Sequence, residues 1–236
     1  MRENKKAEQS DMIPKEYKTE IIYEEGTKTF YIYMLGAITA PEDYTNVLTT
    51  FNTAREDETI RCYFSGPGGR KDTTDIIRHA VFNTEALTVA IIGDCASADT
   101  IIPLAFDELE VMPNIEFMIH SISSGYYSKY HEVVASMDFW KNEMPAALKS
   151  YYKDFLTEDE IEYVVSGNDI YLNSEQVAER WKNVQAAREA EFDAYMAEAN
   201  KDIIQTHISE LNRLGVKIEI PSEEEPKKKA KSKTTK

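Results

Sequence analysis

The chain has 236 residues, of which 42% are apolar, enough for the core of one domain, and this excludes a collagen-like or globally disordered protein. The formal net charge of −15 repels nucleic acid and anionic membranes at long range. The two cysteines and four scattered histidines form neither a disulfide framework nor a metal cluster, and the N-terminus carries no apolar signal region. The longest apolar stretch, residues 86–92, is too short to cross a bilayer, so we expect a cytoplasmic protein without a metal or other cofactor.

Strands alternate with helices in the first half of the chain. Short runs rich in β-branched and aromatic residues predict strands, and longer runs with apolar residues on one face predict helices. This alternation implies right-handed βαβ crossovers and an α/β fold with a parallel sheet. In chain order we expect a strand at 30–35, a helix at 41–57, a strand at 60–64, a helix at 72–83, a strand at 88–92 that ends at Gly93, a helix opened by Ser97, and strands at 108–112 and 116–119.

Helices dominate the second half. Beyond Trp181, apolar residues recur at helical spacing until Gly215, which predicts an amphipathic helix or helix pair. Thr157 and Glu160 have the spacing of a capping box. In chain order we expect a long helix at 130–155, a capped helix at 157–165, a short extended segment at 169–172, and a further helix capped by Asn173 and Ser174.

Four features in this pattern can carry chemistry. Ser97 follows a buried strand and opens a helix, where a hydroxyl lies beside unpaired backbone N–H groups. His120 ends a strand, at the edge where α/β folds place their sites. Gly68 and Gly69 let the backbone approach a ligand closely. Each also has an ordinary structural interpretation, as a helix-capping serine, a hydrogen-bonded histidine or a turn, and Asp169 is one carboxylate among 42 acidic residues.

The same features belong to four motifs that follow one another along the chain. They are Ser65-Gly66-Pro67-Gly68-Gly69, Gly93-Asp94-Cys95-Ala96-Ser97, Met112-Pro113-Asn114 followed by Met118-Ile119-His120, and the segment Asp169-Ile170-Tyr171-Leu172-Asn173-Ser174. They are similar to the N-S-P-G-G, G-x-A-A-S, L-P-N-S…M-I-H and D-x-F-(M/L)-S-A motifs of the proteolytic subunit of the Clp protease (ClpP). The resemblance covers about two thirds of the chain, residues 30–181.

This resemblance to ClpP, a serine peptidase family of the ClpP/crotonase superfamily, implies an endopeptidase that cleaves unfolded polypeptides through an acyl-enzyme. Ser97 would be the nucleophile, His120 the general base, and Asp169 the group that orients the histidine. The N–H groups of Gly69 and Ala98 would form the oxyanion hole. The order Ser…His…Asp and the absence of GxSxG argue against an α/β-hydrolase. Substrate-binding positions implied by the resemblance are Gly68, Ser121, Ser123 and Gly125.

The resemblance also implies a homo-oligomer. In that family a protruding handle helix, here residues 130–155, joins two stacked seven-membered rings into a barrel that encloses the sites, and an AAA+ unfoldase docks on the barrel. The domain organisation expected on this basis is a flexible polar arm at 1–18, a ClpP-like peptidase domain at 19–182, a C-terminal helical extension at 183–220 and a disordered Lys-rich tail at 221–236.

The chain departs from the family pattern in four places. Residues 1–28 do not resemble the segment that helps dock the unfoldase, which argues against that partner. Ser121-Ile122-Ser123-Ser124-Gly125 replaces the family's proline and Gly-Gly after the histidine, a stretch that helps bind substrate. Pro103 falls inside the helix that Ser97 opens, where an interior proline would kink it. Residues 183–236 have no counterpart in the family and would suit a specialised relative, such as a bacteriophage-encoded one.

Two other functions stay open at this stage. The departures at Pro103 and after His120 would suit a catalytically weak or inactive assembly protein on the same fold. A crotonase-type acyl-CoA enzyme shares the superfamily architecture and its backbone oxyanion hole, although the set of Ser97, His120 and Asp169 argues against it.

Overall fold

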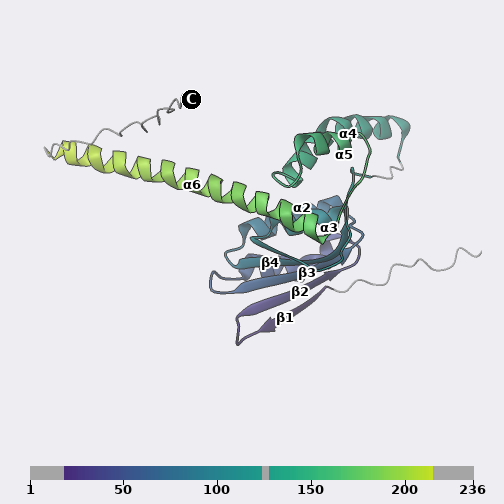
Figure 1. The fold of residues 1–236 in the computed structure, drawn as a ribbon, viewed down its shortest axis with the longest axis horizontal. Coiled ribbons are helices and arrows are strands. Elements are labelled where there is room, and N and C mark those ends of the chain that lie inside the picture. Colours follow the sequence, from purple (N-terminus) through teal and green to yellow (C-terminus); the bar gives the residue numbers. More distant parts are fainter. Residues whose placement is uncertain (1–18, 124–127, 215–236) are drawn as a thin grey trace, which may run out of the picture. The chain divides into compact units, whose positions relative to one another are not determined.

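The computed structural model describes residues 19–123 and 128–214, and these form a mixed α/β fold (Figure 1). The described residues contain a seven-stranded sheet with the order β1-β2-β3-β4-β6-β7, and β5 pairs with β4. The inner pairings are parallel, whereas β1 and β7 at the two edges run antiparallel to their neighbours. This confirms the α/β class and the mainly parallel sheet. The strands are β1 (Glu20–Glu24), β2 (Thr29–Leu35), β3 (Thr59–Gly66), β4 (Leu87–Ala96), β5 (Glu108–Val111), β6 (Phe117–Ile119) and β7 (Ile170–Leu172).

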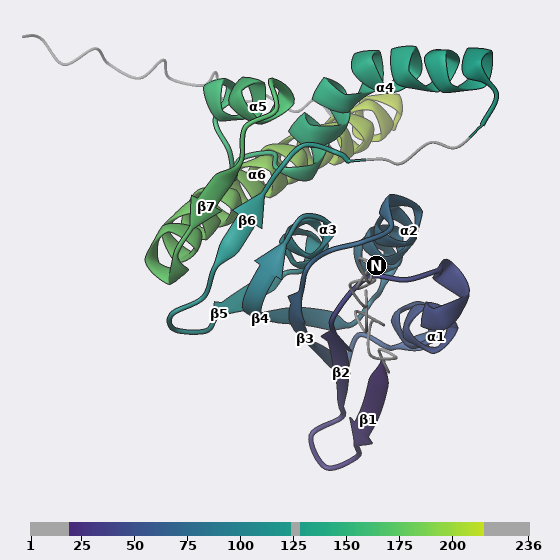
Figure 2. The same cartoon turned by 90° about the vertical axis from the view of Figure 1, so that its right-hand side faces the viewer.

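Helices cover one face of the central strands (Figure 2). Alternate residues of β3 are buried there, namely Ile60, Cys62 and Phe64, because successive side chains of a strand point to opposite faces. The central strand β4 is buried on both faces between Thr88 and Ile92. The helices are η1 (Pro41–Tyr44), α1 (Thr45–Thr53), α2 (Lys71–Asn83), α3 (Ala98–Ile101), η2 (Pro103–Ala105), α4 (Tyr130–Tyr151), α5 (Glu158–Val165) and α6 (Ser174–Arg213).

The central strand β4 is longer than the sequence indicated. We expected it to end at Gly93, but it continues to Ala96. Its far end is held on both sides, because Cys95 pairs with Gly66 of β3 and with Phe117 of β6. Ser97 is therefore the first residue after the end of the strand.

The strand β1 was not predicted. Four of its five residues are exposed, so its sequence lacks the alternation that marks a half-buried strand. It forms by antiparallel pairing with β2 across a turn in which Lys28 has a positive φ of 52°.

Two helix predictions were wrong in detail. The segment predicted as one helix at 41–57 is the 3₁₀ turn η1 followed by α1, which ends at Thr53. Pro103 does not kink a helix, because α3 ends at Ile101 and Pro103 begins η2. At the first position of a helix the missing N–H of proline removes no hydrogen bond.

In the second half, α4 ends at Tyr151 and contains Pro145, and the capping box of Thr157 and Glu160 is confirmed. A single helix, α6, runs from Ser174 to Arg213. The chain divides into one compact unit that ends at Ala186 and another that begins at Ala187. The predicted arm at 1–18 and tail at 221–236 lie outside the described residues. Within the described part, no helix combines the length and apolar character needed to cross a bilayer.

Candidate active site

Ser97 occupies a strained turn between β4 and α3. Its backbone angles are φ 56° and ψ −126°, a conformation that L side chains rarely adopt. The Ser97 N–H donates to the Met118 carbonyl at 2.8 Å, and the Ser97 carbonyl accepts from the Thr100 N–H and hydroxyl at 3.0 and 2.6 Å. The Thr100 hydroxyl also lies 2.7 Å from the buried Tyr152 hydroxyl. These contacts hold a strained residue in place, and such strain clusters at functional sites.

Gly68 and Gly69 lie directly against this turn. A Cβ atom at Gly68 would lie 2.6 Å from the Ser97 Cβ and 2.7 Å from the Ala98 nitrogen, and Gly68 has a φ of 86°. A Cβ atom at Gly69 would lie 2.1 Å from the Ile38 carbonyl oxygen. The Ile38 N–H donates to the Gly68 carbonyl at 2.8 Å, which fixes the segment on its other side. Only glycine fits at these two positions, and this lets the backbone approach Ser97.

His120 and Asp169 lie at the same edge of the sheet as Ser97. In the β6–β7 register Ile119 pairs with Ile170, so His120 and Asp169 are the next residues opposite one another. Opposed residues of antiparallel strands have Cα atoms about 4.5–5.5 Å apart and side chains on the same face. Asp169 is exposed and His120 half-buried. Within residues 19–123 and 128–214, no hydrogen bond joins the side chains of Ser97, His120 and Asp169.

A cavity of about 340 Å³ opens beside Ser97. Neither Asp169 nor Gly68 contributes to its wall, although Gly68 contacts Ser97 from behind. Gly125 lies outside the described residues. Of the residues that the sequence singled out, those that line the cavity are Gly69, Ser97, Ala98, His120, Ser121 and Ser123.

The backbone N–H groups of Gly69 and Ala98 lie at this cavity and have no acceptor among the described residues, and the same is true of several other lining residues. Ala98 is the first residue of α3, where an N–H has no partner within the helix. Unpaired amides beside a serine hydroxyl can stabilise the negative charge that develops on a carbonyl oxygen during acyl transfer.

No group of three or more His, Cys, Asp or Glu side chains in the described part of the chain is arranged to hold a metal ion. No family model matches the chain, and no curated protein does either.

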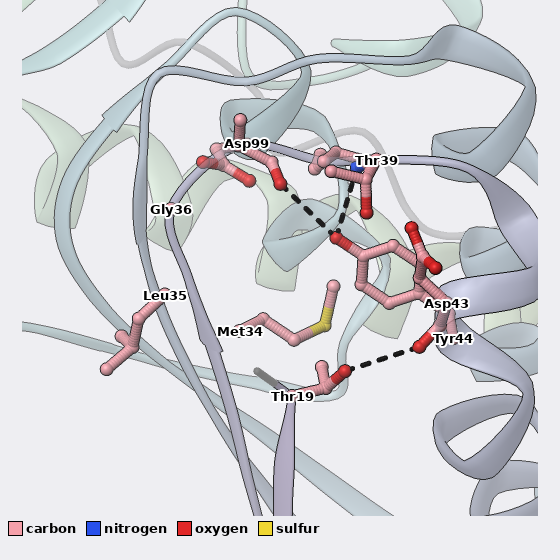
Figure 3. Close-up of a pocket in the computed structure, with 10 residues that line it drawn as sticks. Thr19, Met34, Leu35, Gly36, Thr39, Asp43, Tyr44 and Asp99 are labelled. Atoms are coloured by element: carbon pink, nitrogen blue, oxygen red, sulfur yellow. Dashed lines mark hydrogen bonds between the residues drawn. The ribbon is translucent and has the colours of Figure 1, made fainter. Parts of the chain in front are cut away.

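Asp99 is a site residue that the sequence did not reveal. Its carboxyl group is buried behind Ser97 and accepts the Gly68 N–H at 3.2 Å. Burial raises the pKa of Asp99 to about 7, and the hydrogen bond from Gly68 partly opposes this shift. Asp99 and Tyr44 line a small pocket of about 10 Å³ (Figure 3). Without the fold, the sequence does not show which of the 42 acidic residues has a buried carboxyl group.

Proposed function

We propose that the chain is a serine endopeptidase of the ClpP kind that cleaves unfolded polypeptides. The observation that carries this proposal is the meeting of Ser97, His120 and two unpaired amides at one cavity. The register that sets Asp169 opposite His120 supports Asp169 as the proposed third member of a triad.

In the proposed reaction the Ser97 hydroxyl attacks the peptide carbonyl and His120 takes its proton. The amides of Gly69 and Ala98 hold the oxyanion, and each such donor contributes about 3–4 kcal/mol to the transition state. The C–N bond then breaks as His120 gives the proton to the leaving amine. Water attacks the acyl-enzyme, His120 accepts a proton from it, and the proton returns to Ser97 as the acid product leaves. Asp169 orients the imidazole and stabilises its protonated form.

Self-assembly belongs to the same proposal. The first half of α4 exposes large apolar side chains, namely Tyr130, Val134, Met137 and Phe139. Exposed apolar surface of this kind marks an interaction site. We expect this helix to join copies of the chain into a ring-based homo-oligomer.

Covalent labelling tests the catalytic proposal. A fluorophosphonate probe should label the wild-type protein at Ser97, and the protein should degrade casein. Ser97→Ala should lose both, with activity falling by at least a factor of about 10³, because nothing else supplies the nucleophile. Ser166→Ala, which removes an exposed serine outside the cavity, is the matched control and should behave like wild type. Labelling that persists in Ser97→Ala would contradict the proposal.

One observation favours a second function. The side chains of Ser97, His120 and Asp169, all of them described, are not joined by hydrogen bonds. An inactive assembly protein on this fold would need no such contacts, although catalytic hydrogen bonds can also tighten only when substrate binds. If the chain forms a stable oligomer that the probe does not label and that leaves casein intact, it is an inactive assembly protein.

A further inference from the structure

The residues that line the cavity beside Ser97 differ in charge from the chain as a whole. The protein carries 42 acidic residues against 27 basic ones. Among the described residues no carboxylate lines this cavity, whereas Arg70 and Lys71 do. Each cation also pairs with a carboxylate outside the lining, Lys71 with Asp75 and Arg70 with Asp72. A bound anion would therefore be recognised by the hydrogen-bond donors that these cations have left, rather than by a net positive charge.

Lys71 is held in place beside the buried part of the wall. Its ammonium lies 2.5 Å from Asp75, and the Tyr151 hydroxyl donates to the other oxygen of Asp75 at 2.6 Å. The ammonium also lies over the rings of Tyr151 and Trp140, 5.6 and 5.2 Å from their centroids. Burial disfavours the charged amine, but the hydrogen bonds to Asp75 and Tyr151 outweigh it and the pKa of Lys71 is raised. Lys71 is therefore a fixed cation, and one of its three N–H donors remains beyond those that Asp75 and Tyr151 accept.

The other residues that line the cavity suit the methylene groups of a ligand side chain. Ile101, Leu148 and Tyr151 are buried apolar residues that line the cavity, and the buried Thr74 lies with them. Arg70 is more exposed and pairs with Asp72 at 2.5 Å, so it belongs to the outer rim. A ligand group that matches this wall has methylene groups against Ile101 and Leu148 and a carboxylate at Lys71. The side chain of glutamate has both parts.

We propose that this cavity is the specificity pocket for an acidic side chain, and that the chain cleaves after glutamate in preference to glutamine. The proposal rests on the proposed peptidase function, because Ser97 and the pocket share one cavity. A carboxylate at Lys71 makes a charge-assisted hydrogen bond that the neutral amide cannot match.

Peptide kinetics test the preference. The substrates are fluorogenic peptides that differ only in the residue before the cleaved bond, which is Glu, Gln or Leu. Wild type should favour Glu over Gln by about tenfold in kcat/KM, the ratio that a difference of about 1.4 kcal/mol gives. Lys71→Met should bring this ratio close to one, and Lys71→Arg should keep a ratio above one. Lys149→Met is the control, because Lys149 pairs with Glu158 at 2.6 Å and does not line the cavity.

A binding measurement separates this proposal from the peptidase proposal. Calorimetry on Ser97→Ala compares acetylated peptides that end in glutamate amide or glutamine amide. Tighter binding of the glutamate peptide that is lost with Lys71→Met supports the pocket, even if the wild-type protein cleaves nothing. Cleavage without a preference for Glu, or a preference that survives Lys71→Met, overturns the pocket and leaves the peptidase proposal intact. Equal binding of both peptides by a protein that cleaves neither overturns both.

Discussion

Asp99 joins the strained serine turn to the glycine segment. Asp99 is 1% exposed, and its carboxyl group accepts the Gly68 N–H immediately beside Ser97. Because burial raises its pKa to about 7 in the folded protein, the folded state binds a proton that the unfolded chain releases near pH 4. Stability from this group is therefore full below about pH 4 and falls as the pH rises towards 7.

Asp99→Asn tests this titration. The amide oxygen can still accept the Gly68 N–H, but the side chain no longer ionises. The variant should gain stability relative to wild type as the pH rises, by up to about 3 kcal/mol between pH 5 and 7, since each pH unit changes the free energy by about 1.4 kcal/mol. Urea unfolding of both proteins at several pH values measures the difference. Curves that stay parallel across this range would show that Asp99 does not titrate there.

Gly68 tests the contact between the glycine segment and Ser97. In Gly68→Ala the new methyl group would lie 2.6 Å from the Ser97 Cβ, so the segment must move away from the turn. We expect a loss of stability of about 1–3 kcal/mol and loss of fluorophosphonate labelling. Gly167→Ala is the matched control, because Gly167 also has a positive φ, 98°, but has open space around its Cβ position. It should lose about 1–2 kcal/mol and keep full labelling. Equal labelling of the two variants would show that the close approach has no part in reactivity.

Some residues of the candidate site could be predicted from the sequence and others could not. Ser97 and His120 could be singled out because each follows a recognisable strand, and their positions at strand ends are local properties. Asp99 and Lys71 could not, because their importance comes from burial and from partners such as Tyr151, 80 positions from Lys71. Pairing across such distances is decided by packing of α4 against α2 and leaves no mark in the local pattern.

The ends of strands and helices also depend in part on partners that are distant in sequence, and the connection from β4 to α3 is an example. The strand was expected to end at Gly93 because glycine usually interrupts a strand pattern. It continues because β3 and β6 both pair with its far half, and these partners are distant in sequence. The capping box at Thr157 was predictable because both of its partners lie within four residues. Local chemistry sets the ends of α5, whereas tertiary pairing sets the end of β4 and so the place of Ser97.

The register of β6 and β7 gives the triad proposal its geometry. The local pattern placed His120 and Asp169 at the ends of two short extended segments, and only the resemblance to ClpP related the two residues. Antiparallel pairing of Ile119 with Ile170 makes them neighbours, although 49 positions separate them along the chain. A shift of the register by one residue would turn one of the two side chains to the opposite face. The buried pair Phe117 and Leu172 opposes such a shift, because it would expose one of these side chains to water.

Beyond the single chain, α4 is where the proposed assembly can be tested. Met137 is 64% exposed on the first half of this helix, beside exposed Val134 and Phe139. Isolated surface changes alter folding stability by about 0.5 kcal/mol or less. A charge placed in an interface instead stays unpaired after desolvation and opposes association. Met137→Glu should therefore shift the native mass from the oligomer to smaller species while the folded chain keeps its helical circular dichroism.

Met112 provides the matched control for this change. It is also an exposed methionine, 49% accessible, but lies just after β5, away from α4 in sequence. Met112→Glu should leave the native mass unchanged, because it introduces the same charge outside the proposed interface. If the two variants have the same mass as wild type, α4 does not join the copies. If both dissociate, added charge alone disrupts the oligomer and α4 has no special part in it. Dissociation by Met137→Glu alone, together with loss of casein degradation, would tie the activity of Ser97 to assembly through this helix.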